Sequence, residues 1–126
     1  PAPVRPPAPI DLLILGIGTD GHTASLFPGT DWQTRRSASG FAVFKTPDQP
    51  EPRFSLTLER ILQARKIVIL VNGQSKQQII QKLLFEPDFI CPAGYIASQR
   101  RLTWIIDYAA AGAILSEQIR QNRGCS

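Results

Sequence analysis

Two apolar runs dominate the hydrophobic pattern of this chain. They occupy residues 10–15 and 66–71. Apolar runs of about 4–8 residues that do not alternate with polar positions are typical of strands buried on both faces of a parallel sheet. The pattern therefore predicts two interior strands of a parallel sheet, each followed by a turn that contains glycine.

Weaker patterns complete the predicted order of elements. Apolar residues recur at helical spacing between residues 75 and 85, where we predict a helix. Asp107 stands at the N-cap position of an alanine-rich helix that is predicted to reach residue 121. The remaining predicted elements are strands at 41–44, 54–57 and 102–106, a loop at 46–52 and a short helix at 58–64.

The alternation of strands and helices predicts an α/β fold. The expected architecture is an open, mainly parallel sheet with flanking helices, similar to a Rossmann fold. A chain of 126 residues suits one domain, which we assign to residues 10–126, after a proline-rich arm or linker at residues 1–9. Because the chain opens on a strand of the central, buried type, we expect it to form the C-terminal half of a larger domain.

Composition excludes few classes of function. Hydrophobic residues make up 43% of the chain and charged residues 19%, as in ordinary soluble domains. No apolar run approaches the roughly 20 residues of a membrane span, so we expect a cytoplasmic protein with no membrane partner. The formal net charge is +4, but no cluster of basic residues with interleaved aromatic residues indicates a nucleic-acid partner.

The cysteines and the histidine give no recognisable metal set. Cys91 and Cys125 match no metal or redox spacing, and we interpret them as unpaired thiols in a reducing compartment. The chain has a single histidine. We therefore expect neither a metal nor a cofactor.

That histidine, His22, ends the tightest polar turn of the sequence. The turn reads Gly-Ile-Gly-Thr-Asp-Gly-His over residues 16–22 and follows the first apolar run directly. Histidine ordinarily titrates near neutral pH, and α/β folds place their sites at the ends of strands. His22 is thus the candidate for moving a proton. The structural alternative is a histidine that caps a helix or fills a corner.

The glycines of this turn also match the dinucleotide-binding pattern. That motif works through a long helix that begins inside it and points its N-terminus at a pyrophosphate. Here Pro28 and Gly29 follow too soon for a long helix, and no acidic residue ends a second strand about 20 residues further on. A dinucleotide site is therefore the less favoured interpretation.

A longer string resembles a known family. Residues 11–28, DLLILGIGTDGHTASLFP, closely resemble the signature segment of the 6-phosphogluconolactonases. Segments 52–57, 71–76 and 102–110 resemble the same family more loosely. The related sugar-phosphate isomerase-deaminases share the Gly-x-Asp-Gly-His core but carry a glutamate where this chain has Phe27. The resemblance therefore implies hydrolysis of 6-phospho-D-glucono-1,5-lactone to 6-phosphogluconate, without a cofactor.

The resemblance also implies roles for individual residues. His22 is the implied base that activates water, and Asp20 either orients the imidazole, faces the ligand or only forms the turn. Lys76 is implied to contact the 6-phosphate, with Arg53 as a weaker candidate. Three glycines of the turn have backbone N–H groups that a ligand can approach closely, since no Cβ intervenes: Gly16, Gly18 and Gly21.

One part of the family pattern is missing. The glycine- and serine-rich phosphate loop that the family carries in its N-terminal half does not occur here. We therefore expect the N-terminal half of the fold, or self-association, as the protein partner and a sugar-phosphate lactone as the ligand. The alternatives are a non-catalytic sugar-phosphate-binding module and an inactive fragment. Trp104 and Asp107 are interpreted as structural.

Overall fold

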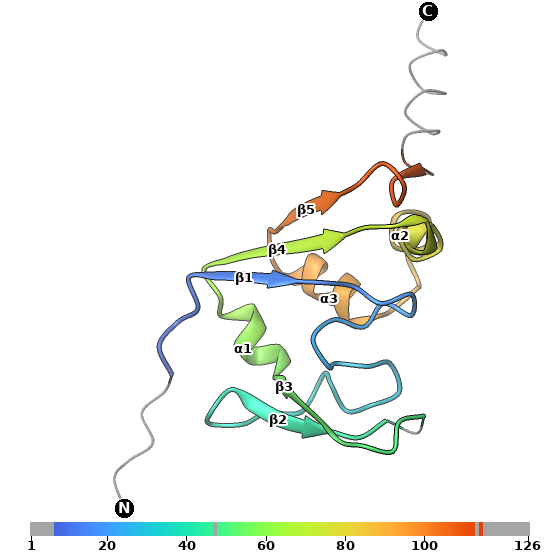
Figure 1. Ribbon diagram of the computed structural model, residues 1–126. Coiled ribbons are helices and arrows are strands. Elements are labelled where there is room, and N and C mark those ends of the chain that lie inside the picture. The colour runs from blue at the N-terminus through green and yellow to red at the C-terminus, as the bar shows by residue number, and fades with distance from the viewer. Residues whose placement is uncertain (1–6, 47, 113, 115–126) are drawn as a thin grey trace, which may run out of the picture.

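A computed structural model describes residues 7–46, 48–112 and 114, and its fold is α/β, as the sequence predicts (Figure 1). A three-stranded parallel sheet has the strand order β1-β4-β5. Its strands are β1 (Leu12–Leu15), β4 (Lys66–Val71) and β5 (Thr103–Ile106). A separate antiparallel pair consists of β2 (Phe41–Phe44) and β3 (Arg53–Leu56).

Two of the helices follow strands, as predicted. The short helix α1 (Leu58–Leu62) begins after Thr57, whose hydroxyl accepts a hydrogen bond from the Arg60 amide at 3.2 Å. After β4, a 3₁₀ turn, η1 (Gln74–Lys76), leads into α2 (Gln77–Phe85). No helix in the described part of the chain is both long and apolar enough to cross a membrane.

A third helix, α3 (Pro92–Gln99), has no counterpart among the predicted elements. Its sequence contains proline and glycine, which weaken a helical pattern. Proline is nevertheless compatible with the first helical turn, where its missing N–H has no partner to lose. The Cys91 sulfur accepts from the Gly94 amide at 3.4 Å, and Ala93 and Ile96 turn toward the core. The helix predicted after Asp107 lies mostly outside the described residues.

The parallel register brings three chain segments to one edge of the sheet. Leu15 pairs with Ile69, and Val71 pairs with Ile106. The carboxyl ends of all three strands therefore face the same way. The Asp107 carboxylate, just after β5, accepts from the amide of Gly73, just after β4, at 3.1 and 3.2 Å. It also accepts from the Ala110 amide at 2.9 Å, as a cap does.

The core lies on only one face of the sheet. Buried residues of all three helices pack there with the strands, in particular Ile61, Ile79 and Ile96. The prediction that the first strand is buried on both faces is wrong. Leu12 is 52% exposed and Ile14 is 56% exposed, because none of the described helices covers their face of the sheet.

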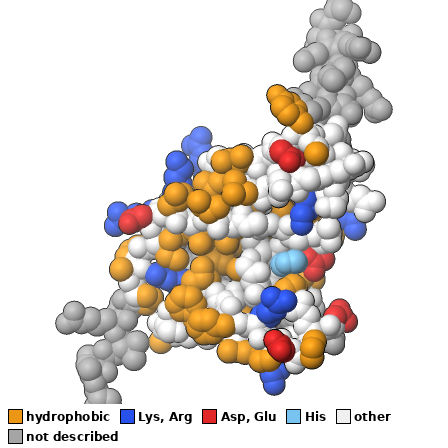
Figure 2. All heavy atoms as spheres, viewed as in Figure 1, with side chains coloured by type: hydrophobic (Ala, Val, Ile, Leu, Met, Phe, Trp, Pro, Cys, Tyr) orange, Lys and Arg blue, Asp and Glu red, His pale blue; other side chains and the backbone are white. Residues whose placement is uncertain are grey.

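An uncovered apolar face results. In the parallel register, Leu12 and Ile14 share their side of the sheet with exposed Leu70 and Ile105. Figure 2 shows hydrophobic side chains gathered over the sheet and over the β2–β3 pair on the same view of the molecule. A contiguous apolar patch of this kind is typical of a surface that another protein element covers.

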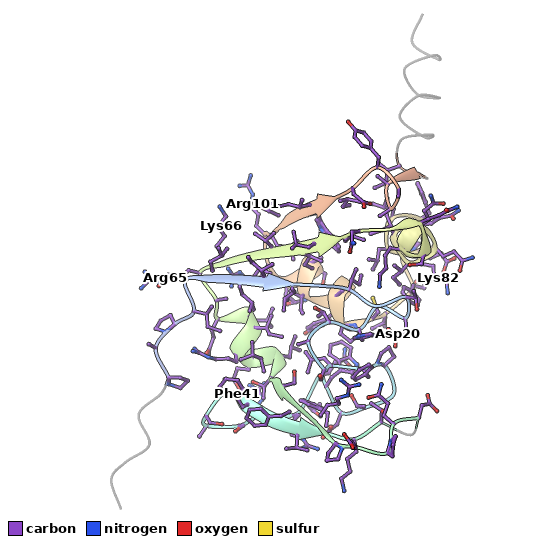
Figure 3. The ribbon with its side chains drawn as sticks, in the orientation of Figure 1. Asp20, Phe41, Arg65, Lys66, Lys82 and Arg101 are labelled. Atoms are coloured by element: carbon purple, nitrogen blue, oxygen red, sulfur yellow. The ribbon has the colours of Figure 1, made fainter. Side chains whose placement is uncertain are left out.

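Basic residues mark the opposite end of the sheet from the glycine turn. Figure 3 places Arg65, Lys66 and Arg101 at that end, away from Asp20. Arg100 is used structurally. Its guanidinium donates to three carbonyl groups at and after the C-terminal end of α1, those of Leu62, Ala64 and Arg65.

The uncovered face predicts how the 126-residue chain behaves when it is expressed alone. We expect self-association and binding of a hydrophobic dye, because the exposed leucines and isoleucines remain in contact with water. Replacing Ile14 and Ile105 by lysine is expected to reduce both, as measured by light scattering and dye fluorescence. Leu84→Lys, at a leucine that is exposed on α2 and does not belong to the uncovered sheet face, is the matched control. A monomeric wild-type chain that binds no dye would contradict the prediction.

Candidate active site

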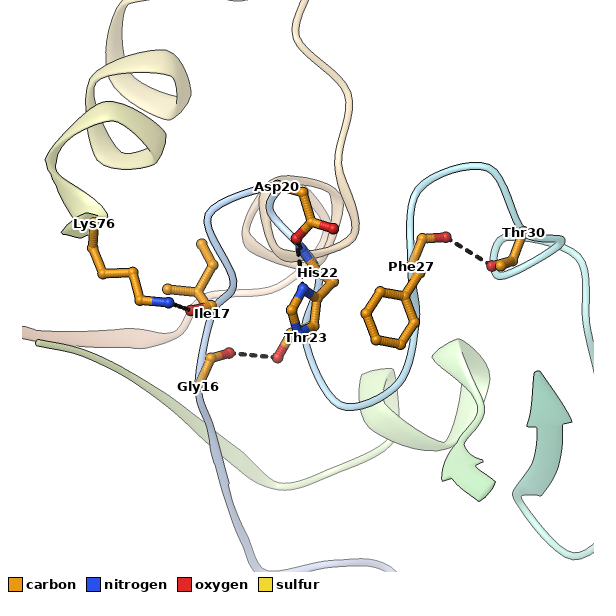
Figure 4. Close-up of polar contacts among 8 residues, drawn as sticks. All are labelled: Gly16, Ile17, Asp20, His22, Thr23, Phe27, Thr30 and Lys76. Atoms are coloured by element: carbon orange, nitrogen blue, oxygen red, sulfur yellow. Dashed lines mark hydrogen bonds and ion pairs between the residues drawn. The ribbon is translucent and has the colours of Figure 1, made fainter. Parts of the chain in front are cut away.

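The glycine turn after β1 folds back on itself (Figure 4). The Gly18 amide donates to the His22 carbonyl at 2.8 Å, and the Gly21 amide donates to the Gly18 carbonyl at 3.0 Å. The buried Thr23 hydroxyl donates to the Gly16 carbonyl at 2.7 Å and so joins the two ends of the turn. Two of the three amides that we expected to face a ligand are therefore occupied within the turn itself.

An acid and the lone histidine form the centre of this turn. Asp20 Oδ1 lies 2.5 Å from His22 Nδ1 and also accepts from the His22 amide at 3.0 Å. Partial burial raises the pKa of Asp20. The hydrogen bonds from His22 and the charge of the imidazole lower it by more, so the pKa of Asp20 lies below its ordinary value. The carboxylate is therefore ionised at neutral pH and acts only as an acceptor.

The ionised carboxylate fixes the tautomer of the imidazole. A carboxylate can accept a hydrogen bond only from a protonated nitrogen, so Nδ1 carries the proton of the neutral ring. Nε2 is then the nitrogen with the lone pair. The His22 side chain is 33% exposed, which leaves the ring accessible to water. Such an arrangement has the chemistry to take up a proton at Nε2 while the acid holds the ring.

The glycines of the turn differ in what they are needed for. A Cβ on Gly18 would lie 2.0 Å from His22 Nδ1 and 2.7 Å from Asp20 Oδ1. Gly21 has a φ of +87°, and a Cβ there would lie 2.5 Å from the Cys91 sulfur. A Cβ on Gly16 would meet no atom within 4 Å. Gly18 therefore makes room for the acid–histidine pair, whereas Gly21 permits the turn to pack on α3.

The first turn of helix α3 is hydrogen-bonded to the glycine turn. The Gly21 carbonyl accepts from the Ala93 amide at 3.1 Å, in the first turn of the helix. Cys91 is 1% exposed and free, and burial raises the pKa of its thiol. Cys91 is thus a packing residue beneath the turn, and Cys125 lies outside the described residues.

Lys76 reaches the same turn from the segment that follows β4. It ends η1, which follows Gly73 at a φ of +95°. Its Nζ donates to the Ile17 carbonyl at 2.6 Å (Figure 4). The structure therefore brings Lys76 and His22 to one turn, although they are far apart in the sequence.

Arg53 does not join this group. It is exposed on β3, and its Nε donates to Gln49 at 2.6 Å. The adjoining part of β3 does touch the segment after His22, since the Ser25 amide donates to the Ser55 hydroxyl at 3.0 Å. In residues 7–46, 48–112 and 114, no three acidic, histidine or cysteine side chains come together as they would around a metal ion.

Sequence reasoning missed one member of the site. The Phe27 ring stacks on the His22 imidazole, with centroids 4.4 Å apart and ring planes 27° apart. In the sequence, Phe27 served only to argue against a deaminase. An aromatic residue five positions after the histidine gives no local signal of stacking, because the contact depends on how the intervening chain turns.

This fold and turn define a sugar-phosphate family. The sequence profile described as "Glucosamine-6-phosphate isomerases/6-phosphogluconolactonase" matches residues 2–104. The chain therefore belongs to this family, as the sequence predicted.

Individual relatives agree with this assignment. The 6-phosphogluconolactonase of Haemophilus influenzae is 40% identical over 111 residues, which cover 85% of this chain and 47% of that protein. A solved structure titled "Crystal Structure of devB protein" has a TM-score of 0.73 at 36% identity, covering 84% of this chain and 45% of the other. A monomeric glucosamine-6-phosphate deaminase has a TM-score of 0.67 at 27% identity, covering 81% and 47%. The chain thus spans less than half the length of each of these proteins.

The two kinds of glycine predict different effects of the same substitution. Gly18→Ala is expected to displace the imidazole and to lower the free energy of unfolding by about 1–3 kcal/mol, as overpacking does. Gly16→Ala is the matched control and should change little, because its Cβ would meet open space. Chemical denaturation measures both variants. Equal destabilisation by the two alanines would contradict the role assigned to Gly18.

The acid of the pair predicts a pH dependence of stability. Folding lowers the pKa of Asp20 below its ordinary 3.8, so its contribution is complete above that value and is lost as the pH falls through the folded pKa. Wild type is therefore expected to exceed Asp20→Asn in free energy of unfolding at neutral pH. The difference should close in strong acid. Urea titrations over this pH range measure it, and a difference that does not change with pH would contradict the ionised pair.

Proposed function

We propose that this chain supplies the general base of a 6-phosphogluconolactonase, a carboxylic ester hydrolase acting on 6-phospho-D-glucono-1,5-lactone. The observation that carries the proposal is the Asp20–His22 pair, in which the carboxylate holds Nδ1 and leaves the Nε2 lone pair for water. The relative from Haemophilus influenzae bears the name of this enzyme. The activity is proposed for the whole protein, since the chain matches under half of that relative.

The proposed reaction needs only one base in this chain. Nε2 takes a proton from water, and the water oxygen bonds to the lactone carbonyl carbon. The tetrahedral intermediate then breaks its bond to the ring oxygen, which receives the proton back from the imidazolium. The Asp20 carboxylate stabilises the imidazolium in between. The product is the open-chain 6-phosphogluconate.

Lys76 is the proposed contact of the substrate phosphate. An ammonium group has three N–H donors, and one of them is directed to the Ile17 carbonyl. That hydrogen bond keeps the positive charge beside the glycine turn, where an anionic substrate would benefit from it. Arg53 is retained only as a weaker proposal, because it contacts Gln49 and not the turn.

The residue at position 27 favours the lactonase over the deaminase. Overall fold does not separate the two, because a glucosamine-6-phosphate deaminase is also a structural neighbour. In this chain an apolar ring lies against the imidazole at the position where the deaminases carry a glutamate. A proton relay through a second carboxylate therefore lacks its acid here. A non-catalytic module is less favoured, since the acid–histidine pair is intact.

The expected protein partner is the other half of the fold. The apolar face that includes Leu12, Ile14 and Ile105 gives a surface for it, and relatives have about twice the length of this chain. Such a partner would also supply the phosphate loop that this sequence lacks. A cytoplasmic location remains the expectation from composition.

Replacing the base tests the proposed function. In the native-length protein, His22→Asn is expected to reduce lactone hydrolysis by about 10²–10⁴-fold, the usual effect of losing a general base. Turnover is followed by proton release and corrected for spontaneous hydrolysis. Arg101→Gln, at the opposite end of the sheet, is the control and should retain activity. Unchanged turnover in His22→Asn would remove this histidine from the reaction.

A further inference from the structure

The stacking of Phe27 on His22 fixes something that the acid alone does not. The hydrogen bond from Nδ1 to Asp20 fixes one atom of the imidazole. The ring can still pivot about that bond, because the torsion that sets its plane has a broad minimum. A ring stacked on one face at 4.4 Å restricts the plane itself.

Phe27 is itself held in place. The preceding residue, Leu26, is fully buried and donates its amide to the Thr23 carbonyl at 3.0 Å. The Phe27 carbonyl accepts from both the hydroxyl and the amide of Thr30, at 2.7 and 3.2 Å (Figure 4). The backbone on both sides of the ring is therefore anchored, so that Phe27 can act as a fixed surface for the imidazole.

Three neighbours then confine the imidazole on separate sides. Asp20 binds Nδ1, Gly18 lies against the edge formed by Nδ1 and Cε1, and Phe27 covers one face. None of these three contacts involves Nε2. The three contacts thus hold the ring and leave Nε2 outside them, as a preorganised base requires.

We propose that Phe27 is a positioning residue, which holds the plane of His22 so that Nε2 points at the attacking water. The proposal rests on the proposed function, because it assigns Phe27 a part in the same reaction. Phe27 contacts neither water nor lactone in this role. It acts through the imidazole, and its loss should therefore lower kcat more than it changes KM.

Leucine and tyrosine variants of the native-length protein test the proposal. Phe27→Leu keeps an apolar side chain but has no ring to stack, and kcat is expected to fall about 10-fold with KM unchanged within about twofold. Phe27→Tyr keeps the ring and should restore kcat. Phe54→Leu is the matched control, because Phe54 is stacked on Phe41 at 5.2 Å on the exposed β2–β3 pair. Thermal unfolding of each variant is the check that it is folded.

A spectroscopic measurement separates the stacking from the activity. His22 is the only histidine among the 126 residues, so the imidazole signals of a protein with labelled histidine can be assigned from their loss in His22→Asn. The Phe27 ring should shift the imidazole protons upfield in wild type and Phe27→Tyr, and this shift should disappear in Phe27→Leu. Phe54→Leu should retain it. The spectra need no substrate.

The outcomes distinguish the two proposals. If Phe27→Leu keeps the kcat of the wild type while His22→Asn is inactive, the positioning role is overturned and His22 remains the base. An imidazole spectrum that Phe27→Leu does not change would also overturn it. If His22→Asn keeps full turnover, the proposed function fails, and a ring-current shift lost in Phe27→Leu then reports a structural contact alone.

Discussion

The hydrogen bond between the Asp20 carboxylate and Nδ1 of His22 is the interaction that organises the site. It requires an ionised acid, and the same bond lowers the pKa of Asp20 and so favours the ionised carboxylate. It also requires a turn tight enough for residues two positions apart to meet. Gly18 provides that turn by leaving space where a Cβ would collide with the imidazole. Charge, tautomer and backbone shape are therefore parts of a single arrangement.

The parallel sheet connects this turn to the rest of the molecule. Because the strands run in one direction, the segments after β1, β4 and β5 meet at one edge. Asp107 holds the Gly73 turn, and Lys76, which follows that turn, donates to Ile17. From the other side, α3 holds the Gly21 carbonyl. The acid–histidine pair is thus supported from three elements that are distant in the sequence.

Local patterns predicted most of the elements but not their surroundings. Strands β1 and β4 follow directly from their apolar runs, and α2 from its helical spacing. Helix α3 escaped prediction because Pro92 and Gly94 obscure its period, although Cys91 caps it. The exposure of Ile14 was also missed, since an apolar residue has the same sequence signal whether or not another element covers its face.

The amino-acid order alone placed Asp20 and His22 in one turn, because they are two residues apart among glycines. It left three roles open for Asp20, and only the folded chain shows its contact with Nδ1 of His22. Such short-range geometry depends little on the remaining chain, and the nearly unbroken match over residues 11–28 also indicated the family. Three other features became visible only in the folded chain. Lys76 binds the Ile17 carbonyl, and Phe27 stacks on the imidazole. A side chain at position 18 would collide with the imidazole, whereas one at position 16 would meet open space. These contacts depend on strand register and on the path of the intervening chain, which no local pattern encodes.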